Sequence, residues 1–152
     1  IMKKENLTPD QMTDVMNKKS GFIGLSGKSS DMRDVVGFAE QGDSRSQLVV
    51  DKLVLDITKL VAAYIAELGG VDLIVFTAGI AENNPWLRED VCKNFEWMGI
   101  RIDKAVNDVT RDAAIISSPD SSAKVALIPT DEELMIARDT MRLTKGLKRY
   151  DK

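Results

Sequence analysis

The chain has 152 residues, 43% of them hydrophobic and 30% charged, which fits one globular domain or one part of a larger protein. Its net charge of −3 argues against a general nucleic-acid binder, and its apolar runs are too short for a membrane span, so we expect a cytoplasmic protein. Because histidine is absent, serine triads and most zinc sites are excluded, which leaves carboxylates, arginine or lysine, backbone amides and hard metal ions for any chemistry.

The first predicted element is a helix that begins after Thr8. Thr8 is a typical N-cap and Pro9 suits the first helical position, while Ser20–Gly21 is expected to end the helix. Residues 21–35 follow, with three glycines and three serines around a short apolar piece. This composition predicts a loop with a brief strand at Phe22–Leu25.

A long helix is predicted from Ser44. Between Gln47 and Leu68, apolar residues recur at three- and four-residue spacing on a stripe so wide that we expect most sides to be covered. Gly69–Gly70 is expected to end this helix with a left-handed C-cap. Two interpretations of the wide stripe remain open, because the helix can lie beneath a sheet or form a subunit interface.

The middle of the chain predicts a strand followed by a helix. The run from Val71 to Phe76 is rich in branched residues and suits a strand buried on both faces. Asn84–Pro85 then opens a helix that Gly99 ends. Its predicted apolar face comprises Leu87, Val91, Phe95 and Met98. The single cysteine, Cys92, lies in this helix and is expected to be a small buried hydrophobic residue.

The last third predicts three strands and a helix. The strands are expected at Ile100–Ile102, Ala113–Ser117 and Lys124–Ile128, the last of them in the sheet interior. Residues 130–133 begin the final helix, and the lysine-rich residues 145–152 are expected to be solvated and frayed. Strands that alternate with helices predict an α/β domain with a partly parallel sheet.

One polar cluster follows the strand that ends at Phe76. Ligands bind beyond the carboxyl ends of strands in such sheets. Gly79 would let the backbone approach a ligand closely, and Asn83 would offer a donor and an acceptor to a base or sugar. The structural alternative is a tight turn at Gly79 with Asn84 as a helix cap. Neither general phosphate-loop pattern, GxGxxG or GxxxxGK[ST], is present here.

Two further clusters have the same double interpretation. Residues 130–133 form either a helix start with Thr130 as its cap or a carboxylate site for Mg²⁺. In the serine-rich loop, Ser30 would cap a helix and Arg33 would pair with a nearby acid. Alternatively, Asp31 would accept from ribose hydroxyls while Arg33 faces phosphate or an aromatic base.

Taken together, the sequence segments that contain the three clusters resemble segments of one protein family. The segments GLSGKSSDMRDV, IVFTAGIAENNPWLRE with MGIRID after it, and IPTDEELMIARDT are similar to the carboxyl-terminal part of acetate kinases, from about Ser20 to Thr140. The resemblance implies a ribonuclease H-like (actin-like ATPase) domain, in the superfamily of sugar kinases, Hsp70 and actin. Its sheet would be mixed, mostly parallel and flanked by helices.

The resemblance also implies an activity and its site. The reaction would be reversible, Mg²⁺-dependent phosphoryl transfer from ATP to acetate, giving acetyl phosphate and ADP, in a homodimer. The residues that match the family's nucleotide-binding segments are Asp31, Met32, Arg33, Gly79, Ile80, Ala81, Glu82 and Asn83. Glu132 matches a magnesium-associated glutamate. Ala81 stands where the family commonly has a second glycine, and its methyl group would narrow the pocket or oppose a positive φ angle.

Members of this family are two-domain enzymes. Residues 1–152 are therefore expected to be the carboxyl-terminal nucleotide-binding portion, an incomplete second domain without the amino-terminal domain. No catalytic residue is expected in this fragment, and the isolated fragment is expected to be inactive, because half a cleft gives little phosphoryl transfer. The alternatives are a propionate or butyrate kinase of the same family and a non-catalytic nucleotide-binding or dimerisation module.

Overall fold

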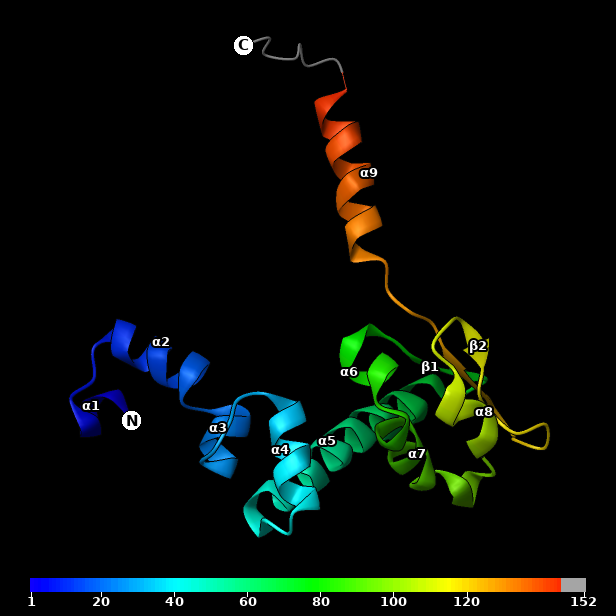
Figure 1. The fold of residues 1–152 in the computed structure, drawn as a ribbon, viewed down its shortest axis with the longest axis horizontal. Helices are drawn as coiled ribbons and strands as arrows, with labels where there is room; N and C mark the ends of the chain where they lie inside the picture. The colour runs from blue at the N-terminus through cyan, green and yellow to red at the C-terminus, as the bar shows by residue number, and fades with distance from the viewer. Residues whose placement is uncertain (146–152) are drawn as a thin grey trace. The chain divides into compact units, whose positions relative to one another are not determined.

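The computed structural model describes residues 1–145, and the chain divides after Gly69 into two compact units (Figure 1). The lysine-rich end expected to be frayed lies outside the described residues, except for Lys145. None of the helices in the described part is long and apolar enough to cross a bilayer.

Residues 1–69, the first unit, form five helices. They are α1 (Met2–Glu5), α2 (Pro9–Lys18), α3 (Gly21–Ser26), α4 (Met32–Glu40) and α5 (Ser44–Leu68). The predicted start of α2 is confirmed. The Thr8 hydroxyl accepts from the Gln11 amide at 3.2 Å, and the Thr8 amide donates to the Gln11 side chain at 2.8 Å, which is a complete capping box.

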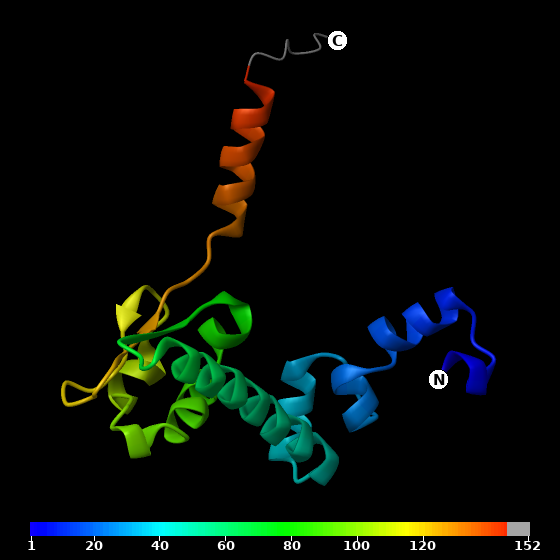
Figure 2. The ribbon, with the colours of Figure 1, turned by 180° about the vertical axis from the view of Figure 1, so that it is seen from behind.

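The strand predicted at Phe22–Leu25 is wrong, because these residues lie in α3. Gly27 ends this helix with a φ of 70°, and its amide donates to the Ile23 carbonyl at 2.8 Å. A short apolar run fits a strand only beside another strand, and residues 1–69 are all helix and connection. Instead, α3 and α4 pack beside α5 (Figures 1 and 2), with Val35 and Val49 buried.

Helix α5 has the predicted bounds. Its C-cap is Gly69 with a φ of 72°, and the Asp43 carboxylate caps its start by accepting from the Ser46 amide at 2.9 Å. The expectation that most of its sides are covered is wrong. Its only buried residues in the described structure are Ser46 and Val49. Other large side chains are exposed, namely Leu48, Leu55, Leu60, Tyr64 and Leu68.

The second unit begins at Gly70 and contains a three-stranded mixed sheet. Its strands β1 (Leu73–Phe76), β2 (Ala114–Ile115) and β3 (Lys124–Leu127) have the order β1-β3-β2. Strand β3 pairs parallel with β1, from Leu73↔Lys124 to Phe76↔Leu127, and antiparallel with β2. The α/β class and the interior position of β3 are confirmed. Of the strand predicted at Ile100–Ile102, only an isolated bridge from Ile102 to Ser117 forms.

The other elements of the second unit are helices. They are α6 (Ala78–Asn83), α7 (Pro85–Lys93), the 3₁₀ helix η1 (Glu96–Met98), α8 (Lys104–Val109) and α9 (Glu132–Thr144). The single helix predicted from Pro85 to Gly99 is therefore divided in two after Lys93. The apolar core comprises Ile74, Phe76, Leu87, Val91, Cys92, Phe95, Ile100, Ile116, Ala123, Val125, Ala126 and Leu127. Burial raises the pKa of Cys92 to about 12, which confirms this residue as an unreactive packing group.

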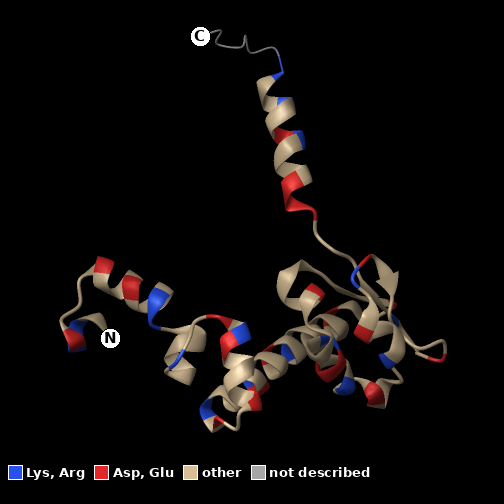
Figure 3. Cartoon of the chain, in the orientation of Figure 1, with Lys and Arg blue, Asp and Glu red and all other residues tan. Residues whose placement is uncertain are grey.

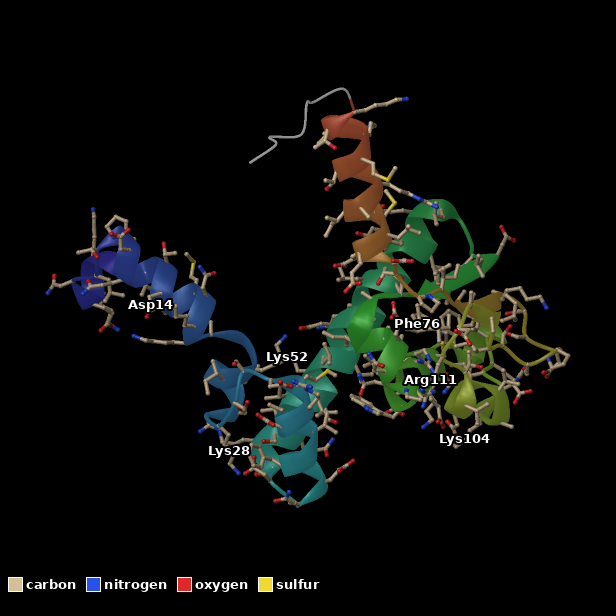
Figure 4. All side chains as sticks on the ribbon, turned by 45° about the horizontal axis from the view of Figure 1, so that its top comes forward. Asp14, Lys28, Lys52, Phe76, Lys104 and Arg111 are labelled. Atoms are coloured by element: carbon tan, nitrogen blue, oxygen red, sulfur yellow. The ribbon has the colours of Figure 1, made fainter. Side chains whose placement is uncertain are left out.

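Strand β1 is buried on one face only. Ile74 and Phe76 are 8% and 7% exposed, whereas Leu73 and Val75 are 48% and 43% exposed. The prediction of burial on both faces is therefore wrong, and the strand shows the alternation of a half-covered sheet. Phe76 (Figure 4) ends this strand on the buried face, directly before the first predicted ligand cluster.

Candidate functional site

The parallel pairing of β1 and β3 brings two of the three predicted clusters to the same edge of the sheet. Phe76 and Leu127 are register partners, and the Ile128 amide extends the ladder by donating to the Phe76 carbonyl at 2.9 Å. Because both strands run in the same direction, the segments that follow them leave from neighbouring points. Helix α6 follows β1, and the connection to α9 follows β3.

The first cluster folds into the short helix α6, and its strained residue is Ala78. Ala78 has a φ of 63°, in the left-handed region that disfavours any side chain. Gly79 lies outside that region, so the tight turn expected at Gly79 is made one residue earlier. Ala81 is helical without a positive φ, and the expected backbone conflict at this position is absent.

Gly79 is not required by packing inside the protein. A Cβ atom at this position would meet only the Asn83 side-chain nitrogen, at an ordinary contact distance of 3.8 Å. That nitrogen donates to the Gly79 carbonyl at 2.8 Å. Gly79, Ile80 and Asn83 are all exposed. Packing within the described residues therefore does not explain the absence of a side chain at this position.

Asn84 stands at the N-cap position of α7 as expected, but its side chain does not accept from the amides of that helix. Its side-chain nitrogen donates back to the Ile80 carbonyl at 2.7 Å, and its oxygen accepts from the Trp86 indole at 3.1 Å. Together with the Asn83 bond, this contact ties the side chains at the end of α6 to the carbonyls of its first turn. The asparagines therefore stabilise α6 itself.

Arg88, which the sequence analysis did not identify, holds α6 from within the core. Its side chain is 0% exposed. It donates to the carbonyls of Ala81 at 2.6 Å and Glu82 at 3.0 Å, and to the Asn107 side-chain and main-chain oxygens at 2.7 and 2.8 Å. In the described residues, all four of these bonds go to neutral groups, and burial lowers the pKa of the Arg88 guanidinium. The only sequence signal is its position directly after Leu87, a residue of the predicted apolar face of this helix.

Glu82 joins the first cluster to the second. One of its carboxylate oxygens accepts from the Thr130 amide at 2.8 Å and from the Thr130 hydroxyl at 3.1 Å. These bonds connect residues that are 48 positions apart in the sequence. The loop after β1 and the segment after β3 are therefore held together by side-chain contacts as well as by the sheet.

Thr130 is not the cap of the last helix, contrary to expectation. Asp131 takes that role, and its carboxylate accepts from the Leu134 amide at 2.9 Å. Glu132 and Glu133 follow in the first turn, and Arg142 lies in the last, a charge order that suits the helix dipole (Figure 3).

Glu132 borders a surface hollow of ≈ 410 Å³. The lining residues are Thr130, Asp131, Glu132, Met135 and Ile136. Within residues 1–145, no three histidine, cysteine or acidic side chains converge as a metal cage. Mg²⁺ bound to a nucleotide needs only one or two protein carboxylates, because phosphates and water supply the other ligands. The exposed Glu132 carboxylate fits that requirement.

The third cluster lies in the first unit, at the start of α4. Asp31, not Ser30, caps this helix by accepting from the Arg33 amide at 2.9 Å, and Met32 is its first residue. The predicted pairing of Arg33 with an acid is confirmed, because its guanidinium binds the Asp31 carboxylate and holds the pKa of that carboxyl down to about 2. That this cluster shares one site with the other two stays a prediction.

Comparison with known proteins identifies relatives along nearly the whole chain. The sequence model described as the acetokinase family matches residues 1–138. The acetate kinase of Clostridioides difficile (strain 630) is 47% identical over 145 residues, which cover 95% of this chain and 36% of that protein.

Two solved structures have the same fold. The Porphyromonas gingivalis acetate kinase matches with a TM-score of 0.82 and 43% identity, over 95% of this chain and 36% of that one. A propionate kinase from Francisella tularensis subsp. tularensis SCHU S4 matches with a TM-score of 0.79 and 32% identity, over 91% and 35%. The chain thus spans little more than a third of the length of these relatives.

Proposed function

The chain belongs to the acetokinase family, and we propose that it is the carboxyl-terminal, nucleotide-side portion of a two-domain acetate kinase. The whole enzyme would transfer a phosphoryl group reversibly from ATP to acetate, with Mg²⁺, and release acetyl phosphate and ADP. It would work in the cytoplasm as a homodimer. The isolated portion would be inactive, because in this proposal the acyl pocket and the catalytic residues would lie in an amino-terminal domain.

The observation that carries this proposal is the pair of hydrogen bonds from Thr130 to Glu82, at 2.8 and 3.1 Å. They join the exposed, glycine-containing segment that follows β1 to the segment that follows β3, where the acidic start of α9 lies. A nucleotide that lies along this edge would have its adenosine against α6 and its phosphates and Mg²⁺ toward Glu132.

The residues have distinct roles in this proposal. Those that would contact the adenosine and its ribose are Asp31, Met32, Arg33, Gly79, Ile80, Ala81 and Asn83, and Glu82 belongs to the same loop. Glu132 would hold Mg²⁺, directly or through water. The ion would neutralise charge on the transferred phosphoryl group, while the protein residues orient the nucleotide.

The proposed nucleotide loop is tested by enlarging Gly79 in the full-length protein. Gly79→Ala is the matched control, because its Cβ atom would meet only the Asn83 side chain, at 3.8 Å. Gly79→Val should weaken ATP and ADP binding much more than Gly79→Ala does, since the larger side chain extends into the space of the ligand. The KM for acetate should change little. Isothermal titration calorimetry and steady-state kinetics give both quantities, and an unchanged nucleotide affinity in Gly79→Val would remove the loop from the site.

A propionate kinase is the second candidate, because the Francisella propionate kinase shares this fold at 32% identity. The acyl pocket lies outside these residues in our proposal, so they do not discriminate between carboxylates. Values of kcat/KM for acetate, propionate and butyrate in the full-length protein separate the candidates. Acetate should give the highest value, and a preference for propionate would support the second candidate.

A further inference from the structure

Glu82 is attached to the structure through both its main chain and its side chain. Its carbonyl accepts from Arg88 at 3.0 Å, and its carboxylate accepts twice from Thr130. An exposed ligand-binding carboxylate would have its oxygens directed to solvent, whereas this one has an oxygen committed to two protein donors.

The main-chain attachment is the rigid one. Arg88 is 0% exposed, and it contacts Asn107, another fully buried residue, through two of its nitrogens. The Glu82 carbonyl is therefore anchored to the core between α7 and α8, and the carboxylate extends from a fixed point. Hydrogen bonds to a charged group are stronger than neutral ones, so the Glu82 carboxylate binds Thr130 more strongly than a neutral acceptor would.

The hydrogen bonds between Thr130 and Glu82 determine where the second cluster, residues 130–133, lies. In the described residues, both hydrogen bonds that Thr130 donates go to Glu82. Asp131, the N-cap of α9, follows directly, and Glu132 is the first residue of that helix. No residue of α9, which is described in full, is buried. The position of the Glu132 carboxylate relative to α6 therefore depends strongly on the Glu82–Thr130 contact.

We propose that Glu82 is a positioning residue that couples the nucleotide loop to the cation side of the site, and not a direct ligand of the nucleotide. This inference rests on the proposed function. By holding Thr130, Glu82 would set where the Glu132 carboxylate meets a nucleotide-bound Mg²⁺. Residues that orient metal ligands in this indirect way commonly change metal affinity or activity by roughly ten- to hundredfold when they are removed.

The test measures how far Mg²⁺ raises the affinity for ADP. Calorimetry on the full-length protein gives the Kd of ADP with saturating MgCl₂ and with excess EDTA, and the ratio of the two is the coupling factor. Glu82→Ala should lower this factor by roughly tenfold or more, because Thr130 loses its acceptor. Glu82→Gln keeps a side-chain oxygen that accepts from the Thr130 amide and should retain most of the factor.

Two controls separate positioning from other roles. Asn83→Ala, on the same helix, should lower both affinities alike and leave the factor unchanged, because among the described residues the Asn83 side chain donates to the Gly79 carbonyl of its own helix and has no hydrogen bond to Thr130. If Glu82 only stabilised the fold and did not position Glu132, Glu82→Ala would lower stability but leave the coupling factor unchanged. Amide hydrogen exchange at Thr130, measured without ligand, should be slow in the wild type and Glu82→Gln and fast in Glu82→Ala.

Each result decides the proposal. A wild-type coupling factor in Glu82→Ala, or equally fast Thr130 exchange in the wild type and Glu82→Ala, would overturn it while the proposed function stands. Failure of the wild-type protein to bind ADP at all would instead overturn the proposed function, and the coupling with it.

Discussion

Ala78 carries the clearest backbone strain next to the candidate site. Its φ of 63° lies where a Cβ atom crowds the following carbonyl, at a cost of about 1 kcal/mol. Strain of this kind persists only where the surroundings enforce it, and it commonly accompanies function. Here it turns the chain from β1 directly into α6, so that the exposed residues of α6 follow the strand without an intervening loop.

Replacing Ala78 with glycine should therefore stabilise the protein. We expect Ala78→Gly to raise the free energy of unfolding by about 1 kcal/mol, because glycine adopts a positive φ without a steric penalty. Ala81→Gly is the matched control, since Ala81 is helical in the same element, and it should lower the free energy of unfolding by about 0.5–1 kcal/mol. Urea denaturation measures both. Equal destabilisation by the two changes would contradict the strained geometry at Ala78.

Among the elements, α6 is the one whose position needs the most explanation, because it has six residues and none is buried. It is attached to the core through hydrogen bonds from the Arg88 guanidinium to two of its carbonyls. A helix this short is not stable by itself, and its end carbonyls need partners. The buried guanidinium supplies them, and it links α6 to α7 and α8 at one point.

Replacing Arg88 should remove the hydrogen bonds that join α6, α7 and α8 and so destabilise the protein. Arg88→Leu leaves four carbonyl or amide-oxygen contacts without their donor, and we expect a loss of roughly 3 kcal/mol in the free energy of unfolding. Arg111 (Figure 4) is the matched control, because it is exposed and, within residues 1–145, its side chain bonds only to the nearby carbonyls of Asp108 and Thr110. Arg111→Leu should change stability by less than about 0.5 kcal/mol. Similar losses in both variants, measured by thermal or urea unfolding, would argue against the special role of Arg88.

On the scale of the whole molecule, α5 leaves a row of large apolar side chains exposed. Leu60 and Tyr64 are each 60% exposed. Leu60, Tyr64 and Leu68 follow one another at four-residue spacing and so share one face of the helix, and an exposed apolar patch of this kind is typical of an interaction surface. The proposed homodimer gives this row one possible role, which solution measurements test directly.

Sedimentation velocity of the full-length protein should show a dimer. If α5 contributes to the dimer interface, Leu60→Asp should shift the equilibrium toward monomer, because a carboxylate in an apolar interface is left without a partner. Asp51→Asn, an exposed change on the same helix, should leave the equilibrium unaltered. A wild-type monomer at high concentration would contradict the homodimer, and a dimer unaffected by Leu60→Asp would exclude α5 from its interface.

The sequence by itself predicted elements whose causes are local. The N-cap at Thr8 and the bounds of α5 with its Gly69 cap follow from residues that act within a few positions, and the short apolar run of β3 predicted an interior strand. It also predicted the family, because three separated motifs keep their order. The strand expected at Phe22–Leu25 failed because a short apolar run has no intrinsic preference until a partner surface is available.

The tertiary structure alone decided which polar groups meet. No local pattern shows that Glu82 binds Thr130 across 48 positions, or that Arg88 enters the core to hold Ala81 and Glu82. Nor does a local pattern show that α9 begins at Glu132, so that Asp131 and not Thr130 stands at its N-cap. Hydrogen bonds over long sequence separations depend on how strands pair and helices pack, and spacing along the chain does not encode that geometry.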